Sequence, residues 1–223
     1  MASPRTLATA AGTCFLATHV TSIGGLVLYG PVLKTADYVV GAGPDTRLLL
    51  GALFEVLLTI GIIGTAFTLY PVARRHGEGL AAGYLGLRTL EAAVIAVGIV
   101  SLLAVVTLRQ HPPQGADNAS LLTVGRALVA VHDWTFLLGP NFICGANTAV
   151  LALLLYRARL VPRFIAVLGL VGGALIFASA IAVLFGVYQQ VSGFGMLAAV
   201  PVFAWELCLA VRLITRGFDP AAA

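Results

Sequence analysis

Six apolar runs, each long enough to cross a lipid bilayer, constrain this chain more than any other feature of its sequence. They cover residues 7–29, 47–72, 80–108, 121–156, 162–186 and 194–216. About 20 apolar residues suffice to cross the hydrocarbon core as an α-helix, which rises roughly 1.5 Å per residue. Because a backbone inside lipid must satisfy its own hydrogen bonds, the runs predict an all-α bundle of six transmembrane helices. Short connections with Gly and Pro join them, so we expect a single domain over residues 1–223.

The fourth run, residues 121–156, is too long for one straight crossing. Its 36 residues would extend roughly 54 Å, against a hydrocarbon core of ~30 Å. Pro140 follows Gly139 in its middle, where a proline deletes one backbone hydrogen bond and clashes with the preceding turn. We therefore expect a long fourth helix that is kinked near Gly139-Pro140. Asn141 and Asn147 follow, and their amides are suited to satisfying the freed backbone groups or to lining a cavity.

The composition argues against a soluble fold and against a nucleic-acid partner. Hydrophobic residues make up 60% of the 223 residues and charged residues 10%, against roughly a quarter charged in soluble domains. The mean hydropathy is +1.00. The net charge of +4 comes from Lys and Arg residues scattered over short connections, which form no basic face. Membrane lipid is therefore the expected partner, and the oligomeric state is left open.

The distribution of basic residues predicts the orientation of the bundle. With six spans, eight of the 13 Lys and Arg residues fall on the side of both termini, three fall on the opposite side, and Arg88 and Arg126 fall within long runs. Lys and Arg are enriched in cytoplasmic connections. We therefore expect a multi-pass protein of a bacterial cytoplasmic (inner) membrane with both termini in the cytoplasm. The first run exceeds the ~7 to 15 residue core of a signal peptide and is expected to remain as a helix.

Four acidic residues are candidates for catalytic groups because they fall within the apolar runs. They are Glu55, Glu91, Asp133 and Glu206. Each ionised side chain at bilayer depth costs on the order of 2.5 to 3.5 kcal/mol, so these acids must face the interior and be paired or protonated. A buried acid is suited to donate a proton, and a neighbouring carboxylate or histidine is suited to accept one.

Six further residues are candidate ligand-binding positions. They are His19, Arg88, His132, Asn141, Asn147 and Trp205. Arg88 is permanently charged, and Glu91 lies three residues later on the same helix face, so we expect an ion pair. Each residue also has a purely structural interpretation, since an Arg–Glu pair often only holds helices together and a buried His or Trp often only packs. The joint number of acids, histidines and amides exceeds what helix association needs, which favours an interior polar site.

No sequence motif specifies the chemistry. The chain contains no HExxH, no GxSxG and no nucleotide-binding glycine loop. Cys14, Cys144 and Cys208 lie within apolar runs without ligand spacing, so we predict neither a disulfide framework nor a metal site. A haem between His19 and His132 would need both at matching depth on facing helices, and we predict no cofactor.

The order of the polar landmarks resembles a known family. The landmarks are Glu55, Leu69-Tyr70-Pro71, Tyr84, Arg88, Glu91, Gly139-Pro140-Asn141, Leu155-Tyr156-Arg157, Leu160-Val161-Pro162-Arg163, Trp205-Glu206 and Arg216-Gly217-Phe218. Over nearly the whole chain they resemble the bacterial multi-pass membrane family catalogued as domain of unknown function 4386. The resemblance implies a six-helix membrane protein and no established activity. Its implied landmarks within the membrane are Glu55, Arg88, Glu91 and Glu206. His19 and the His132-Asp133 pair are candidates on depth alone.

Three functions are compatible with these residues. In the first, a buried polar pocket binds a small lipophilic molecule and transforms it by acid-base chemistry such as isomerisation, cyclisation or hydrolysis. In the second, the same acids form the relay of a proton-coupled transporter for small solutes, with the break at Gly139-Pro140 as a discontinuous helix. In the third, the protein is a structural or accessory membrane subunit.

Overall fold

The computed structural model describes residues 3–35 and 37–219. In chain order the elements are α1 (Pro4–Lys34), the 3₁₀ turn η1 (Tyr38–Val40), α2 (Thr46–Ala73), α3 (Glu78–Gln110), α4 (Asn118–Leu137), the π-helical segment η2 (Leu138–Ile143), α5 (Cys144–Ala158), α6 (Arg163–Leu184) and α7 (Gly193–Thr215). The described ranges contain no β-strand. Since α4, η2 and α5 form one continuous helical span, six helices within these ranges are long and apolar enough to cross a membrane. The predicted all-α six-helix bundle is confirmed.

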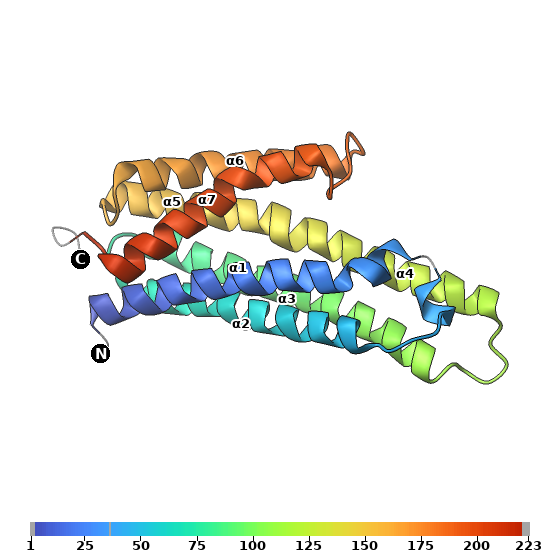
Figure 1. Cartoon of the computed structure of the whole chain (residues 1–223). Coiled ribbons are helices and arrows are strands. Elements are labelled where there is room, and N and C mark those ends of the chain that lie inside the picture. Colours follow the sequence, from blue (N-terminus) through green and yellow to red (C-terminus); the bar gives the residue numbers. More distant parts are fainter. Residues whose placement is uncertain (1–2, 36, 220–223) are drawn as a thin grey trace.

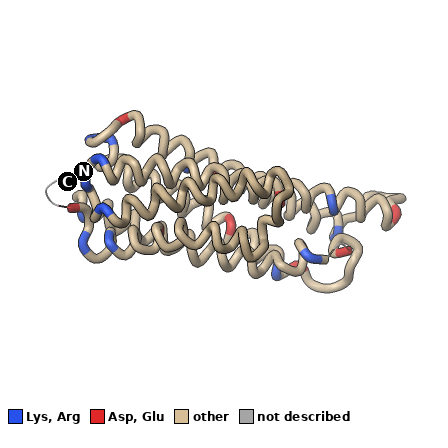
Figure 2. Tube along the Cα trace, turned by 90° about the horizontal axis from the view of Figure 1, so that it is seen from above, with Lys and Arg blue, Asp and Glu red and all other residues tan. Residues whose placement is uncertain are grey.

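The helices pack in a ring around the bundle axis. Helix α1 packs on α2, α2 on α3, α3 on both α4 and α5, α5 on α6, α6 on α7, and α7 on α1. Both termini lie at one end of the bundle (Figure 1), here called the termini end, and Lys and Arg residues gather there in Figure 2. The opposite end is called the distal end. There α3 and α4 extend well beyond the shorter hairpin of α6 and α7 (Figure 1).

The helix ends follow from capping residues in the sequence. Ser3, Asp117 and Ser192 each accept a hydrogen bond from a backbone N–H in the first turn of α1, α4 and α7. At the other end of the fourth span, Arg159 adopts a left-handed conformation with φ of 54°, which ends α5 before Pro162 begins the next helix. The observed ends lie within a few residues of the ends of the apolar runs.

The predicted interruption of the fourth helix is confirmed at Gly139-Pro140. The backbone changes to π-helix over Leu138–Ile143. Pro140 has no N–H, so the carbonyl oxygen of Phe136 loses its usual helical donor. The Asn141 Nδ2 donates to that oxygen at 3.3 Å, which satisfies the freed group as the sequence predicts.

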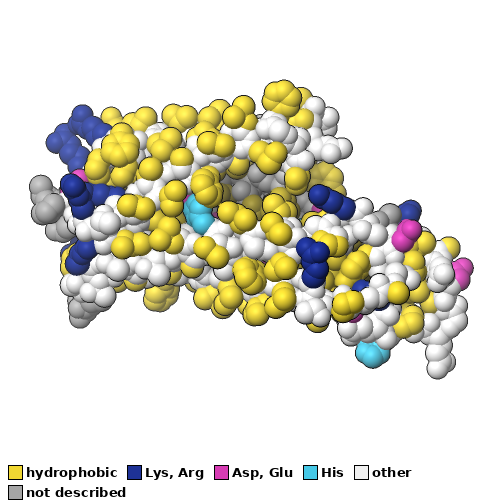
Figure 3. Space-filling view, in the orientation of Figure 1, with side chains coloured by type: hydrophobic (Ala, Val, Ile, Leu, Met, Phe, Trp, Pro, Cys, Tyr) yellow, Lys and Arg dark blue, Asp and Glu magenta, His cyan; other side chains and the backbone are white. Residues whose placement is uncertain are grey.

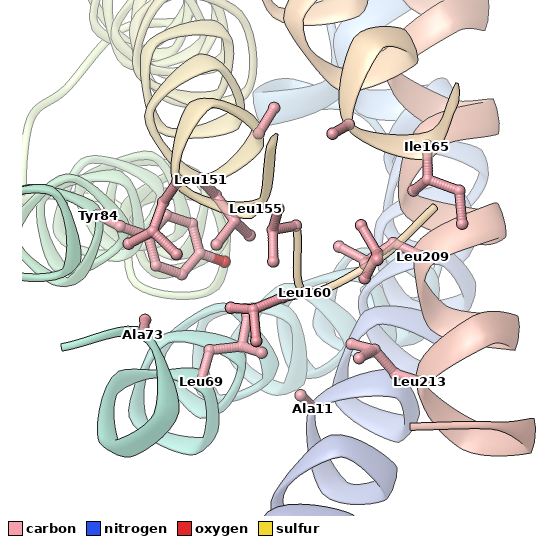
Figure 4. Packing of buried hydrophobic residues seen from close by; sticks show 14 of the residues in the cluster. Ala11, Leu69, Ala73, Tyr84, Leu151, Leu155, Leu160, Ile165, Leu209 and Leu213 are labelled. Carbon is pink, nitrogen blue, oxygen red and sulfur yellow. The ribbon is translucent and has the colours of Figure 1, made fainter. Parts of the chain in front are cut away.

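Hydrophobic packing closes the bundle at the termini end. Figure 4 shows Leu69, Tyr84, Leu155 and Leu209 from four helices together with Leu160 from the connection between α5 and α6. They belong to a buried cluster that includes side chains from α1, α2, α3, α5, α6 and α7. Arg5 adds hydrogen bonds from its guanidinium to the last carbonyls of α7. This end of the ring is therefore sealed.

The distal half is packed on one side only. A second buried cluster joins α1, α2 and α3, and it includes Tyr29, Leu48, Ile62 and Leu102. Helix α7 buries Val202 and four residues that follow it, but none in its distal part, Gly193–Pro201. The ring is therefore open in the region between the second cluster and the distal part of α7.

The outer surface is apolar, as a lipid-facing surface must be. Large hydrophobic side chains such as Val20, Ile60, Phe67 and Val100 are more than half exposed. Figure 3 shows hydrophobic side chains over the middle of the molecule, with Lys and Arg toward the two ends. Exposed apolar area on this scale has no stable place in water, so the chain is an integral membrane protein in contact with lipid.

Helices α5 and α6 approach each other closely through glycines. A Cβ on Gly173 would lie 2.7 Å from the carbonyl oxygen of Gly145. In lipid, where hydrophobic association between helices is weak, such close backbone packing is a main source of helix affinity.

The variant Gly173→Ala should therefore lower the free energy of unfolding by about 1 to 3 kcal/mol, because the added methyl group forces α5 and α6 apart. The matched control is Gly86→Ala, since an added Cβ there meets no atom within 4 Å. Reversible denaturation in mixed micelles measures both. An equal response of the two variants would contradict the close-packing argument.

A polar clamp joins the connection before α2 to the last turn of α3 at the distal end. Asp45 accepts hydrogen bonds from Arg109 and Gln110 and from the hydroxyl of Tyr38. Arg109 also donates to the carbonyl oxygens of Gly41 and Gly43 and lies over the Tyr38 ring. Burial opposes ionisation of Asp45, but the hydrogen bonds from Gln110 and Tyr38 and the Arg109 guanidinium outweigh it and lower the pKa of Asp45.

Because the pKa of Asp45 is lower in the folded state, its contribution to stability is complete above the unfolded value of about 3.9 and is lost as the pH falls through the folded value. We expect Asp45→Asn to be less stable than the wild type at neutral pH and to lose this part of the acid dependence. Melting temperatures measured from pH 7 downward test this. The exposed Glu78→Gln serves as the control, and an unchanged acid dependence in Asp45→Asn would refute the clamp.

Candidate functional site

A cavity of about 330 Å³ occupies the open region of the distal half, and residues from every helix of the ring line it. The walls are mostly apolar and include Leu58, Ile62, Ile95 and Ile176. Its volume is at the small end of the range typical of ligand pockets, roughly 300 to 1,000 Å³. The cavity therefore suits a small, largely apolar molecule.

The cavity opens sideways between α1 and α7. Near the termini end these helices touch, since a Cβ on Gly12 would lie 2.7 Å from the Ala210 carbonyl oxygen. At mid-height the rings of His19 and Phe203 lie 4.6 Å apart. Beyond them the two helices diverge (Figure 1), and the face in Figure 3 is hollowed between them. Ile23 and Met196 both line the cavity and are more than half exposed at its mouth.

An ion-pair cluster lies on the side of the cavity toward the termini end. Arg88, only 2% exposed, donates from Nη1 to Glu91 Oε2 at 3.0 Å and from Nη2 to Glu206 Oε1 at 3.5 Å. Its Nε donates to the hydroxyls of Thr65 and Tyr84 at 3.1 and 3.2 Å. The arginine thus joins α2, α3 and α7 through all three of its nitrogens.

Two further side chains extend this cluster. Asn147 on α5 donates from Nδ2 to Glu91 Oε2 at 2.7 Å. His19 on α1 donates from Nδ1 to the Phe15 carbonyl oxygen at 2.8 Å, and the same nitrogen lies 3.8 Å from Glu206 Oε2. A carbonyl can only accept, so Nδ1 carries a proton and Nε2 of the neutral ring is a proton acceptor. The His19 nitrogen nearest Glu206 is therefore a donor, and the free acceptor of the ring is its other nitrogen.

A second polar group lies nearer the distal end, formed by Tyr29, Glu55 and His132. All three line the cavity and are nearly fully buried. The Tyr29 and His132 rings meet edge to face, with centroids 5.5 Å apart. Within residues 3–35 and 37–219, neither Glu55 Oε2 nor the Tyr29 hydroxyl has a hydrogen-bond partner, although both atoms are buried. Such orphaned polar atoms are costly unless something else satisfies them.

The structure places most of the predicted site residues together. Those that line the cavity are His19, Glu55, Arg88, Glu91, His132, Asn141 and Glu206. Asn147 lies behind this lining and acts through Glu91. The predicted convergence of membrane-depth charges on a shared interior is thus present in the geometry.

Two predicted residues lie elsewhere. The Asp133 side chain is 63% exposed and faces a separate cavity of about 270 Å³ near Lys34 and Arg126, because adjacent helix positions point about 100° apart. Trp205 is buried against Phe15 and α6, where a Cβ on Gly169 would lie 2.4 Å from its Nε1. Trp205 therefore packs the core and does not line the cavity.

Sequence reasoning missed two participants of the site. Tyr29 carries no charge and is not among the predicted site residues, yet its hydroxyl is buried at the cavity. Thr65 donates to the Ile62 carbonyl oxygen and accepts from Arg88, and nothing in the sequence distinguishes it from other helix threonines. The four-residue spacing of Tyr84 and Arg88, by contrast, predicts contact on one helix face.

The arrangement can bind and move protons but shows no metal cluster. Within the described residues, no three His, Cys, Asp or Glu side chains lie close enough together to hold a metal ion. What the cavity offers is a buried carboxylate without a cationic partner, an acceptor nitrogen on His19, and an apolar interior that strengthens electrostatic interactions.

The fold and this cavity define a multi-pass integral membrane protein with a polar site inside its helix ring. The chain belongs to the family described as "Domain of unknown function (DUF4386)", whose sequence profile matches residues 10–217. This confirms the resemblance drawn from the polar landmarks. No curated protein and no solved structure matches the chain.

The ion-pair cluster should show strong energetic coupling. Arg88→Met should cost about 3 to 5 kcal/mol of unfolding free energy, because it leaves Glu91 and Glu206 buried without a cation. Adding Glu91→Gln to Arg88→Met should cost clearly less than the sum of the two single changes, since it removes one of those charges. A double-mutant cycle in mixed micelles measures the coupling.

The control cycle pairs Arg88→Met with Asp45→Asn. The partner of Asp45, Arg109, lies about 30 Å from Arg88 along α3, so these two changes should add. Additivity in the Arg88–Glu91 cycle as well would contradict the proposed dependence of Glu91 on the arginine.

Proposed function

We propose that the protein binds a small lipophilic molecule taken laterally from the bilayer and transforms it by acid-base chemistry in the cavity. The observation that carries this proposal is an apolar cavity that opens between α1 and α7 toward lipid and contains the unpartnered Glu55 carboxylate. A helix bundle that needed only stability would gain by closing such a space, since cavities cost packing energy.

The route of entry supports a lipophilic ligand. The mouth is bordered by Ile23 and Leu26 on α1 and by Met196 and Phe203 on α7, all of them at least partly exposed. A solute from water would have to cross this apolar rim, whereas a molecule dissolved in the membrane meets it directly. The ligand therefore arrives already partitioned into the lipid.

The polar groups supply proton donors and acceptors at two places along the cavity. Glu55 and His132 lie in one place, and Glu206 and His19 lie in the other. A protonated carboxyl donates to a developing anion, and a carboxylate or the free imidazole nitrogen removes a proton. Isomerisation, cyclisation and hydrolysis of an amphipathic molecule are the reactions that such pairs can promote.

A proton-coupled carrier is the second candidate, and the π-helical break favours it. Pro140 and Asn141 in η2 line the cavity, and helix discontinuities of this kind border substrate sites in many transporters. Purified protein in proteoliposomes distinguishes the two functions. A carrier moves protons across the bilayer when solute is added, whereas an enzyme changes the solute without net proton movement.

We further propose that the whole chain acts as a single domain in a bacterial cytoplasmic membrane, with the termini end in the cytoplasm. Arginines of the predicted cytoplasmic set gather at that end in Figure 2, in keeping with the enrichment of basic residues on the cytoplasmic side. Labelling of single cysteines introduced at Glu78 and His111, on opposite ends, tests this orientation.

Blocking the mouth should abolish ligand binding. Ser22 lines the cavity at its opening on α1, whereas Val20 is 66% exposed to lipid and does not line the cavity. Native mass spectrometry of protein released from nanodiscs should show a small-molecule adduct on the wild type and on Val20→Phe. Ser22→Phe should lose it, while its melting temperature stays close to that of Val20→Phe.

Two results would count against this proposal. One is a wild type that carries no adduct and binds no added lipophile. The other is an adduct that survives in Ser22→Phe, which would place the binding site outside the cavity.

A further inference from the structure

We propose that the ligand of this cavity is an amphipathic amine, whose ammonium group pairs with Glu55 while its apolar part lies along the cavity wall. This inference rests on the proposed function, and it adds the chemical class of the ligand. It comes from comparing which charged groups of the cavity are already satisfied and which are not.

The cavity offers no free cation to an anionic ligand. Arg88 is the one Lys or Arg among the described residues that line it. All three guanidinium nitrogens of Arg88 already donate, to Glu91, Glu206 and the hydroxyls of Thr65 and Tyr84. Its planar group also lies 5.5 Å from the centre of the Phe15 ring, which fixes it further. A carboxylate or phosphate ligand would add a further negative charge beside Glu91 and Glu206, which already balance the guanidinium.

Glu55, by contrast, is unsatisfied. Its side chain lines the cavity and is 7% exposed, and Oε2 has no hydrogen-bond partner in the part of the chain that is described. None of the ion pairs within the described ranges includes Glu55. The Tyr29 hydroxyl beside the cavity is likewise buried and unpartnered. An ammonium group beside these two oxygens has enough N–H groups to donate to both.

The local backbone is shaped to hold Glu55 in this position. A Cβ on Gly25 would lie 3.1 Å from Glu55 Cγ, so the absence of a side chain on α1 leaves the space that the glutamate occupies. The carboxylate is thereby held beside the cavity, away from the lipid.

The charge balance points to the same class of ligand. Three carboxylates line the cavity, Glu55, Glu91 and Glu206, against the single guanidinium of Arg88. The titratable groups that line the cavity from other helices near Glu55 are Tyr29 and His132, and neither is a permanent cation. Uncompensated negative charge at membrane depth is costly, and a bound ammonium group lowers that cost.

The test compares three probes of equal chain length: decylamine, decanol and decanoate. Each is added in deuterium-labelled form to the protein in nanodiscs, and binding is measured by native mass spectrometry at neutral pH. Partition into the lipid is the same for every protein variant, so differences between variants report the site. The wild type should prefer decylamine over decanol by about tenfold or more, equivalent to about 1.4 kcal/mol, and should bind decanoate least.

Glu55→Gln should remove this preference, so that decylamine and decanol bind alike. Glu78→Gln is the matched control, because it removes the same charge from an exposed position at the start of α3, and it should leave the preference intact.

Should Glu55→Gln fold poorly, Tyr29→Phe removes only a hydroxyl and should reduce decylamine binding more than decanol binding. Acidification should also erase the preference of the wild type, because the alkylammonium keeps its charge while Glu55 takes up a proton.

The inference fails if the wild type binds the amine and the alcohol equally, prefers decanoate, or keeps its amine preference in Glu55→Gln. In each of these cases the proposed function survives as long as Ser22→Phe still blocks binding of decanol. If Ser22→Phe blocks no probe at all, the cavity is not the binding site and both proposals fail together.

Discussion

The guanidinium of Arg88 is the charge around which this membrane protein is arranged. It cannot lose its proton at any physiological pH, and it lies almost fully buried inside the ring. Its partners come from separate helices, with Thr65 on α2, Glu91 on α3 and Glu206 on α7. Through Glu91 it also fixes Asn147 on α5. This permanent charge constrains which faces of α3 and α7 point inward, because rotating either helix would expose the guanidinium or its carboxylates to hydrocarbon. The side chains of Thr65 and Asn147 add hydrogen bonds from α2 and α5.

Hydrophobic packing and charged contacts stabilise different parts of the bundle. At the termini end, tight contacts between leucines and close glycine approaches hold the helices together, as expected where lipid removes the hydrophobic drive for association. The arginine cluster borders the cavity on that side. Beyond it α7 diverges from α1 and buries none of its distal residues, Gly193–Pro201. The cavity therefore forms because α7 packs against α1 near the termini end and diverges from it toward the distal end. This geometry is suited to lateral entry from lipid.

The sequence predicts the features that follow from the cost of burying polar groups. Six spans, the break at Gly139-Pro140 and the rescue of a freed carbonyl by Asn141 all come from backbone hydrogen bonding in lipid. It does not predict which face of a helix a residue occupies when depth is the only guide. Asp133 follows His132 directly, yet the helix turns it away from the cavity. The mouth between α1 and α7 depends on the tilt of whole helices, for which no local pattern exists.

Arg88 and Glu55 differ in whether the protein supplies hydrogen-bond partners for them. This difference distinguishes a structural role from a functional one better than burial does. Both are nearly inaccessible. Each nitrogen of Arg88 donates to a protein partner and two carboxylates balance its charge, so the interpretation of Arg88 and Glu91 as a link between helices is sufficient for this pair. Glu55 has an oxygen that no described residue satisfies, and its side chain lines the cavity that opens between α1 and α7. A buried carboxylate with an oxygen that no described residue satisfies is a candidate binding group for a ligand.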